Sequence, residues 1–472
     1  MGSENSQLGI LFFPFMAPGH IIPMTNMAKL FAARGVKATI VTTPLNVPFV
    51  SRTIERIETC GGATAKVDIQ TIKFPVEKAG LPEGCENFEF LPSEMLSSFL
   101  KALAVLQEPL EQLLHDADCL VADMFYPWAT DAAAKFGIPR LVFNGTSFFS
   151  ITAMESMTQY YSEPFLIPNF PGEIKLTSMQ VPSFIREEVE TDMTNVLKEA
   201  AEAGMRSYGI VVNSFYELEP AYADHYRNVL GKKAWHIGPV SVCNKEGQDK
   251  ESSVDEHECL KWLNTKKPNS VVYVCFGSMA YFNDSQLMEI AMGLEASGQQ
   301  FIWVVRKEKN GSGGKEEWLP QGFEKRMEGK GLIIRGWAPQ ILILDHEAVG
   351  GFVTHCGWNS TLEGVTAGVP MVTWPGFADQ FFNEKLVTQV LKIGVDVGAE
   401  RCVDGVDEVG EESIKKEAIE KAVKRIMVGE KADEMRSQAK ALGEMARRAV
   451  EEEGSSYSDL NSLIGELKSR CP

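Results

Sequence analysis

Short apolar runs alternate with stretches of helical periodicity through most of the 472-residue chain. In the first half these runs are continuous rather than alternating, which is typical of strands buried on both faces of a parallel sheet. They span residues 9–15, 38–42, 67–72, 119–123, 141–143 and 209–213. Helical patterns at 21–34, ended by Gly35, and at 92–115 lie between them. The first half is therefore predicted to be a doubly wound α/β domain.

The same alternation restarts after a polar stretch that follows Cys243. The strands predicted there lie at 270–276, 301–305, 331–335, 351–354 and 371–373. A helix is predicted at 285–296, and charged helices follow from residue 412. We expect two domains, over 1–245 and 258–452, joined by a linker over 246–257 and followed by a final helix over 453–472.

Two Rossmann-like domains that face each other across a cleft are the simplest α/β architecture for this pattern. In such sheets ligands bind at the carboxyl ends of the strands, which is where the polar motifs of this chain fall. The Gly-rich segment 308–317 has charged neighbours and no strand–helix pair around it, so we interpret it as a surface loop rather than a phosphate site.

Charge and cysteine content narrow the function and the compartment. A net charge of −18 and a pI near 5.0 argue against binding of nucleic acid or of an anionic membrane. Nine cysteines without a Cys-x-x-Cys pair indicate a reduced intracellular protein, and no apolar run reaches the roughly 20 residues that span a bilayer. A loose myristoylation pattern at Gly2 and Ser6 lacks the second signal that stable anchoring needs. We expect a cytoplasmic protein, in which the sequons at Asn144 and Asn359 stay unmodified.

A histidine follows the first predicted strand, and an aspartate ends the fourth. His20 lies at the start of a helix, a position that disfavours imidazolium and suits a general base. Asp123 ends the fourth strand at the same edge of the sheet. Each residue alone could be only a packed or capping side chain. Together they predict a His–Asp dyad in which the carboxylate fixes the tautomer of the imidazole.

The segment FVTHCGWNSTLEG, residues 352–364, places several polar groups where a strand meets a helix. Asn359 and Glu363 share a helix face, and the amides at a helix start favour a phosphate. Ser360 and Glu363 also fit a capping box and could be purely structural. With Trp337 placed to stack a base, the segment predicts a nucleotide site with the diphosphate at the turn and the ribose at Glu363.

Residues 337–380, WAPQILILDHEAVGGFVTHCGWNSTLEGVTAGVPMVTWPGFADQ, resemble the signature box of plant secondary-product glycosyltransferases over its full length. The resemblance to this family-one group continues through PGHIIPM, DMFYPWATDAA and VVNSFYELE, near the branch that acts on triterpenoids, flavonoids and other phenolics. It implies a GT-B fold in which 1–245 bind the acceptor, 258–452 bind a UDP-sugar, and the final helix packs back on the first domain.

Matched by position, the resemblance also implies roles for individual residues. At the uracil and ribose end it implies Trp337, Ala338, Gln340 and Glu363. Around the diphosphate it implies Ser278, His355, Asn359 and Ser360. At the sugar it implies Trp358, Asp379 and Gln380. Two phenylalanines, either acceptor walls or simply core residues, are Phe125 and Phe377.

The implied reaction is inverting transfer of glucose from UDP-glucose to a hydroxyl of a lipophilic plant small molecule, giving a β-glucoside. His20 would take the hydroxyl proton, and the diphosphate residues would stabilise departing UDP. We therefore expect no metal and no cofactor beyond the co-substrate, and a monomer suffices. Gln380 goes with glucose in this family, whereas other members use UDP-galactose, UDP-glucuronic acid or UDP-xylose.

Two departures from the family pattern and three rival functions remain open at this point. Gly376 stands where the family commonly has a larger apolar residue, and Asn144 where relatives often have histidine. A non-catalytic UDP-sugar-binding protein is the main alternative, opposed by the intact His20 and Asp123. A dinucleotide oxidoreductase is disfavoured because no G-x-G-x-x-G follows a strand, and a serine hydrolase because no Gly-x-Ser-x-Gly elbow is present.

Overall fold

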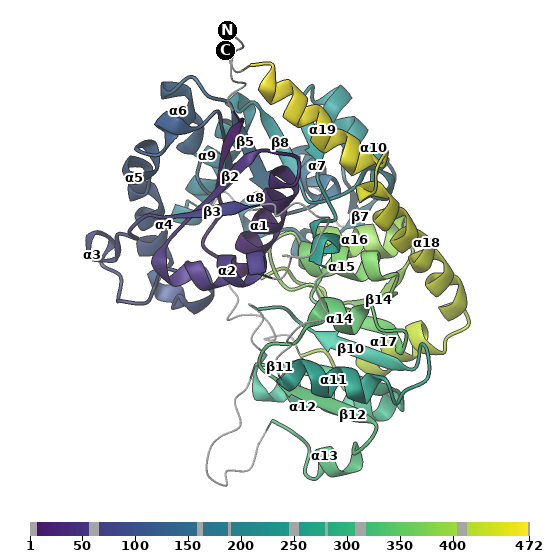
Figure 1. The fold of residues 1–472 in the computed structure, drawn as a ribbon. Coiled ribbons are helices and arrows are strands. Elements are labelled where there is room, and N and C mark those ends of the chain that lie inside the picture. The colour runs from purple at the N-terminus through teal and green to yellow at the C-terminus, as the bar shows by residue number, and fades with distance from the viewer. Residues whose placement is uncertain are drawn as a thin grey trace. The chain divides into compact units, whose positions relative to one another are not determined.

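The computed structural model describes residues 7–55, 66–157, 164–186, 190–244, 254–278, 282–306, 318–403 and 413–470. They fall into two compact units, each built on a parallel sheet (Figure 1). Unit 1 comprises residues 1–148, 188–250 and 448–472, and unit 2 comprises 149–187 and 251–447. The Gly-rich segment 308–317, the start of the chain and most of the expected linker lie outside the described residues.

The sheet of unit 1 has the strand order β3-β2-β1-β4-β5-β8-β9, with all neighbours parallel. Its strands are β1 (Gly9–Phe13), β2 (Lys37–Thr42), β3 (Val67–Thr71), β4 (Cys119–Asp123), β5 (Arg140–Asn144), β8 (Gly209–Val212) and β9 (Ala234–His236). The strand order reverses between β1 and β4, which are direct neighbours with Phe12 beside Val121. Ligands bind at such a switch point in doubly wound sheets.

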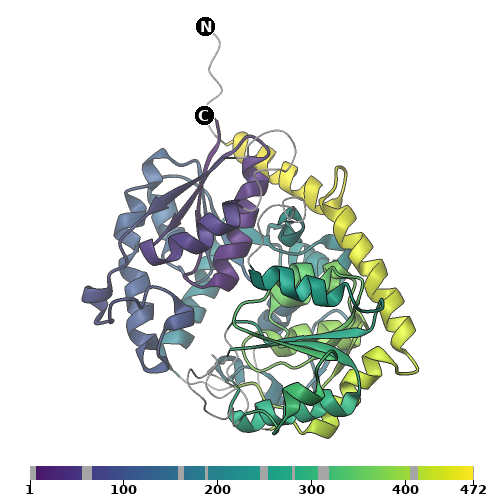
Figure 2. The same ribbon diagram turned by 60° about the horizontal axis from the view of Figure 1, so that its bottom comes forward.

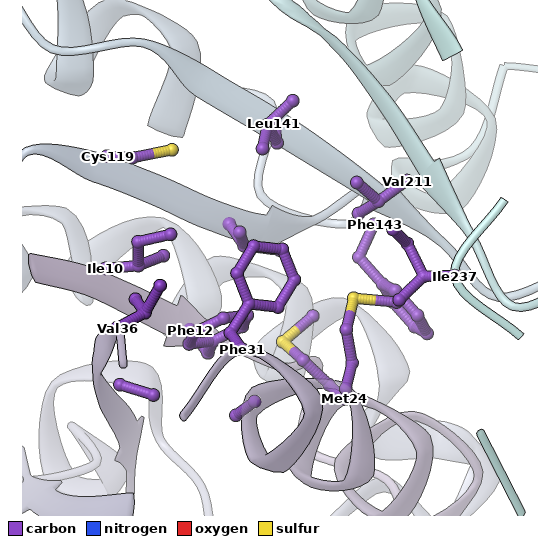
Figure 3. Close-up of a cluster of buried hydrophobic side chains, with 14 of the residues drawn as sticks. Ile10, Phe12, Met24, Phe31, Val36, Cys119, Leu141, Phe143, Val211 and Ile237 are labelled. Carbon is purple, nitrogen blue, oxygen red and sulfur yellow. The ribbon is translucent and has the colours of Figure 1, made fainter. Parts of the chain in front are cut away.

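Successive residues of the unit 1 strands bury opposite faces of the sheet, as the pleat requires. Ile10 and Phe12 pack with α1 (Pro18–Ala32) and α19 (Ser455–Lys468), and Figure 3 shows Phe12, Phe31 and Phe143 among the side chains of this layer. Phe13 faces the other way, toward α4 (Leu96–Val105), α5 (Gln107–Glu111) and α6 (Ala129–Lys135). The last helix of the chain therefore completes the core of unit 1.

The sheet of unit 2 repeats this plan with the order β12-β11-β10-β13-β14-β15, and in Figure 2 its strands lie between layers of helices. The strands are β10 (Val271–Cys275), β11 (Gln300–Val305), β12 (Gly331–Arg335), β13 (Val349–Thr354), β14 (Met371–Thr373) and β15 (Gly394–Asp396). Its main helices are α11 (Val254–Leu263), α12 (Asp284–Ser297), α14 (Gln340–Leu344), α15 (Trp358–Ala367), α16 (Gln380–Lys385), α17 (Lys416–Met427) and α18 (Ala432–Val450). The order reverses between β10 and β13, which marks the switch point of this unit.

The structure departs from the sequence prediction in the helix expected at 92–115 and in the placement of residues 149–187. The single helix expected at 92–115 is broken after Val105, because Pro109 in α5 has no amide hydrogen to donate to the carbonyl four residues earlier. Residues 149–187, expected in the first domain, cluster with unit 2. Hydrogen bonds from Ser150 to Asn383 and from Cys402 to Met179 hold them there, and such long-range contacts leave no mark on local periodicity.

Candidate active site

His20 and Asp123 meet at the switch point of unit 1. Pro18 occupies the first position of α1, and the amide of His20 donates to the Ala17 carbonyl at 2.9 Å, so the imidazole is carried on the first turn. Nδ1 of His20 lies 2.7 Å from Oδ2 of Asp123. Since an ionised carboxylate only accepts hydrogen bonds, we infer that Nδ1 carries the hydrogen and Nε2 the lone pair. The carboxylate is fully buried, while 24% of the His20 side chain is exposed.

Asp123 is itself held from two sides. Its Oδ1 accepts a hydrogen bond from the amide of Phe125 at 3.2 Å. The buried guanidinium of Arg140 donates through Nη2 to the Asp123 backbone carbonyl at 2.9 Å and through Nη1 to the hydroxyl of Thr130 at 2.5 Å. Burial lowers the pKa of Arg140 to about 10, with the negative charge of Asp123 opposing the fall, so it stays cationic at neutral pH. Arg140 was not singled out from the sequence.

Aromatic rings and one glycine surround the imidazole. A Cβ on Gly145 would lie 3.2 Å from Cε1 of His20, so this glycine allows the β5 loop to pack directly on the ring. The ring centroids of Phe15 and Phe125 lie 5.3 Å and 5.8 Å from that of His20, both edge-on. Phe88 extends this apolar surface, with its centroid 5.4 Å from Phe15. Among the predicted acceptor walls, Phe125 thus lies beside the dyad.

Phe377, the other predicted acceptor wall, and Asn144, one of the departures from the family pattern, have different surroundings. Phe377 belongs to unit 2, where it bridges to Val403 and packs against the core of that sheet. Asn144 ends β5, and its buried Oδ1 has no hydrogen-bond partner among the described residues. An unsatisfied buried oxygen is costly, so this position has an unused capacity to accept a hydrogen bond beside Gly145.

His355 lies at the switch point of unit 2, between two glycines. A Cβ on Gly277, which follows β10, would lie 2.6 Å from Cε1 of His355, and one on Gly357 would lie 2.4 Å from Nε2. Burial lowers the pKa of His355 to about 4, so the ring is neutral at physiological pH. Its Nδ1 has no hydrogen-bond partner within the described ranges. Ser278, next to Gly277, is therefore brought to the same turn as His355 by the packing of β10 against β13.

Gln340 connects the start of α14 to α15. Its Nε2 lies 2.7 Å from Oε2 of Glu363 and 3.0 Å from the hydroxyl of Ser360, while the Tyr273 hydroxyl donates to its Oε1 at 3.4 Å. The capping box considered for Ser360 and Glu363 is wrong, because α15 is capped by Gly357 without a side-chain hydrogen bond. Burial raises the pKa of Glu363 to about 7, with the amide of Gln340 partly opposing the rise.

The two tryptophans of the predicted donor site differ in exposure. Trp337 follows β12 after Gly336, whose φ of +113° turns the chain, and 58% of the tryptophan is exposed. The neighbouring Ala338 is buried, and its carbonyl accepts from the amide of Gln340 at 2.9 Å. Trp358 is only 3% exposed, so its indole is buried and its side chain offers little surface to a sugar. Asn359 follows on the first turn of α15.

The last two residues of the signature segment are fixed by their neighbours. Oδ2 of Asp379 accepts from Nδ2 of Asn383 at 2.9 Å. Oε1 of the buried Gln380 accepts from the amides of Gly376 and Phe377, at 2.8 Å and 3.1 Å. The departure at Gly376 thus lies in direct contact with Gln380 through its backbone.

Neither a metal centre nor a membrane-spanning helix occurs in the part of the chain that the structure describes. Within it, no three His, Cys, Asp or Glu side chains gather to hold a metal ion. No helix in the same ranges is long and apolar enough to cross a bilayer.

Comparison with known proteins gives concordant matches over nearly the whole chain. Residues 118–435 match the family model described as UDP-glucoronosyl and UDP-glucosyl transferase. A scopoletin glucosyltransferase of Nicotiana tabacum is 57% identical over 98% of both chains. A UDP-glucose flavonoid 3-O-glucosyltransferase 7 of Fragaria ananassa is 56% identical over 98% of this chain and 96% of its own.

A solved structure agrees with these sequence matches. UGT73P12 of Glycyrrhiza uralensis, crystallised with glycyrrhetinic acid 3-O-monoglucuronide, is 39% identical to this chain. The two structures align with a TM-score of 0.86 and cover 98% of this chain and 96% of the other. The similarity therefore extends over both sheets.

Proposed function

Because the chain belongs to the plant family-one UDP-glycosyltransferases, enzymes with the GT-B fold that use a UDP-sugar as co-substrate, we propose that it glucosylates a phenolic hydroxyl. The donor is UDP-glucose and the product a β-glucoside. The observation that carries the proposal is the His20–Asp123 pair, an imidazole held by a buried carboxylate at 2.7 Å in an aromatic surrounding.

His20 acts as the general base. Its Nε2 takes the proton of the acceptor hydroxyl, a step worth roughly 10² to 10⁴ in rate for a well-placed base. The acceptor oxygen then attacks the anomeric carbon from the side opposite UDP, the bond from that carbon to the diphosphate oxygen breaks, and UDP leaves with the electron pair. Asp123 keeps the hydrogen on Nδ1 and stabilises the imidazolium that forms.

The donor is bound by the signature segment of unit 2. Trp337 offers an exposed indole on which uracil can stack, and Glu363, oriented by Gln340, accepts hydrogen bonds from the ribose hydroxyls. The diphosphate binds at the start of α15, where helix amides favour anions, beside neutral His355, Ser278, Asn359 and Ser360. Asp379 and Gln380 contact the sugar, whereas Trp358 contributes its backbone at the helix start because its indole is packed away.

A phenolic acceptor is favoured over an aliphatic alcohol for two reasons. The relatives at 57% and 56% identity are named for scopoletin and flavonoid substrates. A phenol also loses its proton near pH 10, as tyrosine does, which is within easier reach of an imidazole base than an alcohol. A triterpenoid is the second candidate acceptor, because the Glycyrrhiza uralensis structure contains a derivative of glycyrrhetinic acid, which has an aliphatic skeleton that is bulkier than a simple phenol.

We also propose that the enzyme works as a monomer in the cytosol. Both sequons are poorly available in the folded chain, because Thr361 is fully buried and Thr146 is 6% exposed. The cysteines that the structure describes as free, among them Cys119 and Cys356, are buried and reduced. The cytosolic location can be tested by cell fractionation, together with mass spectrometry before and after glycosidase treatment. A glycan on Asn359 would contradict it.

The test of the reaction is UDP release with EDTA present. UDP-glucose, UDP-galactose and UDP-glucuronic acid are each offered with coumarins, flavonols, simple phenols and triterpenoid aglycones. We expect turnover with UDP-glucose and a phenol, and loss of turnover in His20→Ala. Preference for another donor would overturn the role of Gln380. Tight UDP-glucose binding without turnover across the panel would identify a non-catalytic binding protein instead.

A further inference from the structure

Asn383 is a fully buried amide on α16 that none of the sequence motifs singled out. Its Nδ2 donates to the backbone carbonyl of Cys356 and to Oδ2 of Asp379, both at 2.9 Å. Its Oδ1 accepts from the hydroxyl of Ser150 at 2.9 Å. The orientation of the amide is determined by chemistry, because a carbonyl and a carboxylate only accept while a hydroxyl can donate.

The two groups that accept from Nδ2 belong to opposite ends of the proposed donor site. Asp379 precedes α16 and is proposed to contact the sugar. Cys356 follows His355 and precedes Gly357, which caps α15, so its carbonyl lies in the turn proposed to hold the diphosphate. One amide group of Asn383 therefore joins the sugar end to the phosphate end, although the two segments are more than 20 residues apart in sequence.

The turn at Cys356 has a backbone conformation that requires support. Its φ of +64° is in the left-handed region, which residues with a side chain seldom adopt unless their surroundings impose it. The side chain of Cys356 is fully buried, and its amide lies 3.3 Å from the hydroxyl of Thr354. The hydrogen bond from Asn383 reaches the carbonyl of the same residue, and so ties the Asp379 carboxylate to this turn.

We propose that Asn383 is a positioning residue for sugar transfer, which holds the Asp379 carboxylate in a fixed place relative to the His355–Gly357 turn. Ser150 orients its amide, so a helix outside the signature segment contributes to the donor geometry of unit 2. This inference rests on the proposed function, because it concerns how the UDP-sugar is held. Displacement of a positioning contact by about 1 Å can cost about 100-fold in rate.

The experiment compares Asn383→Ala with a matched control, Gln389→Ala. The amide of Gln389 is partly exposed, and within the described contacts it bonds to the backbone of Lys175. For both variants kcat and KM are measured with UDP-glucose, together with the dissociation constant of UDP alone, the melting temperature, and the ratio of rates with UDP-glucose and UDP-galactose. For Asn383→Ala we expect kcat to fall about 100-fold, the donor ratio to decrease, and UDP affinity to stay within about threefold. Gln389→Ala should match the wild type in all of these.

A double-mutant cycle with Asp379→Asn separates positioning from general structure. If Asn383 acts through Asp379, the double variant is no slower than the slower single variant, whereas independent effects multiply. Multiplying losses, or an unchanged kcat and donor ratio in Asn383→Ala, would overturn the inference. A fall in UDP affinity that parallels kcat would also overturn it, because a purely structural role affects donor and product alike.

Two further results keep the test decisive. If Asn383→Ala does not fold, the test uses Ser150→Ala, which removes only the hydroxyl that orients the amide. We expect kcat of this variant to fall by about threefold to tenfold, and a wild-type kcat would refute the inference. If the wild type itself transfers nothing from UDP-glucose, the proposed function fails. An active wild type with an unaffected Asn383→Ala variant refutes the positioning role alone.

Discussion

Replacing Asp123 with asparagine should disable the base while leaving the fold intact. In the wild type, Oδ1 of Asp123 accepts from the amide of Phe125 and Oδ2 accepts from Nδ1 of His20. An asparagine has one oxygen and one NH₂ group, so only one of these two donors keeps an acceptor. If the NH₂ group faces His20, Nδ1 must become the acceptor, and the hydrogen moves to Nε2, the atom that has to take the substrate proton.

The size of the effect follows from the geometry of the pair. Two unit charges 2.7 Å apart attract by about 6 kcal/mol at an effective dielectric constant near 20. Because 24% of the His20 side chain is exposed and a neutral hydrogen bond could replace the charged one, we expect a loss of about 3 to 4 kcal/mol from the transition state. This corresponds to a fall in kcat of between about 10² and 10³.

The assay is UDP release under saturating donor, with Asp131→Asn as the matched control. Asp131 undergoes the same chemical change but forms an exposed ion pair with Arg206, which is worth about 1 kcal/mol or less. The control should keep kcat within about twofold, and both variants should keep the wild-type melting temperature within a few degrees. A folded Asp123→Asn enzyme with a kcat within threefold of wild type would refute the assignment of His20 and Asp123 as a dyad.

Three further changes test the donor site and the core. The pKa of Glu363 is raised from 4.5 to about 7, so between these pH values the folded chain retains a proton that the unfolded chain loses, and stability falls as the pH rises through this range. In urea titrations at pH 8, Glu363→Gln should therefore be more stable than the wild type by at most about 3 kcal/mol, although it should bind UDP more weakly. Equal stability of the two proteins at pH 8 would contradict the burial of this carboxyl group. Trp337→Ala should weaken UDP binding by tenfold or more in calorimetry through lost stacking, while stability changes by less than about 0.5 kcal/mol because the side chain is 58% exposed. Leu463→Ala should cost about 2 to 5 kcal/mol in chemical unfolding, because Leu463 is fully buried in the core of unit 1. Exposed Met205→Ala should cost almost nothing, and equal effects would refute the docking of α19.

Local sequence predicted the parts of the fold whose signal is local. Buried parallel strands carry dense apolar runs, and the bounds of β4, β12 and β14 agree with the prediction to the residue. The strands β9 and β15 escaped prediction because each is only three residues long and neither forms an apolar run. The assignment of residues 149–187 to unit 2 depends on distant partners, and no periodicity within the segment reports it.

Some residues of the candidate site could likewise be predicted from local sequence, and others could not. His20 and Asp123 could be paired from sequence because His20 follows β1 and Asp123 ends β4, and these neighbouring parallel strands end at the same edge of the sheet. Arg140 and Asn383 were missed because most of their partners lie in other elements, as Asp123 does for Arg140 and Cys356 for Asn383. One signal for Asn383 was present, since Asp379 and Asn383 are four residues apart and so share a helix face. The capping-box prediction was wrong because the side chains of Ser360 and Glu363 both form hydrogen bonds with Gln340, which lies outside α15.

The most direct test of inverting glucosyl transfer by His20 is the anomeric configuration of the product, followed by proton NMR during turnover. Purified wild type is incubated with UDP-glucose, EDTA and the best phenolic acceptor from the panel, alongside folded His20→Ala. We expect the wild type to convert the α-anomeric signal of UDP-glucose directly into a β-glucoside signal, with one UDP per glucoside, and the His20→Ala reaction to be slower by roughly 10² to 10⁴. An α-glucoside product, or equal rates for the two proteins, would contradict the mechanism.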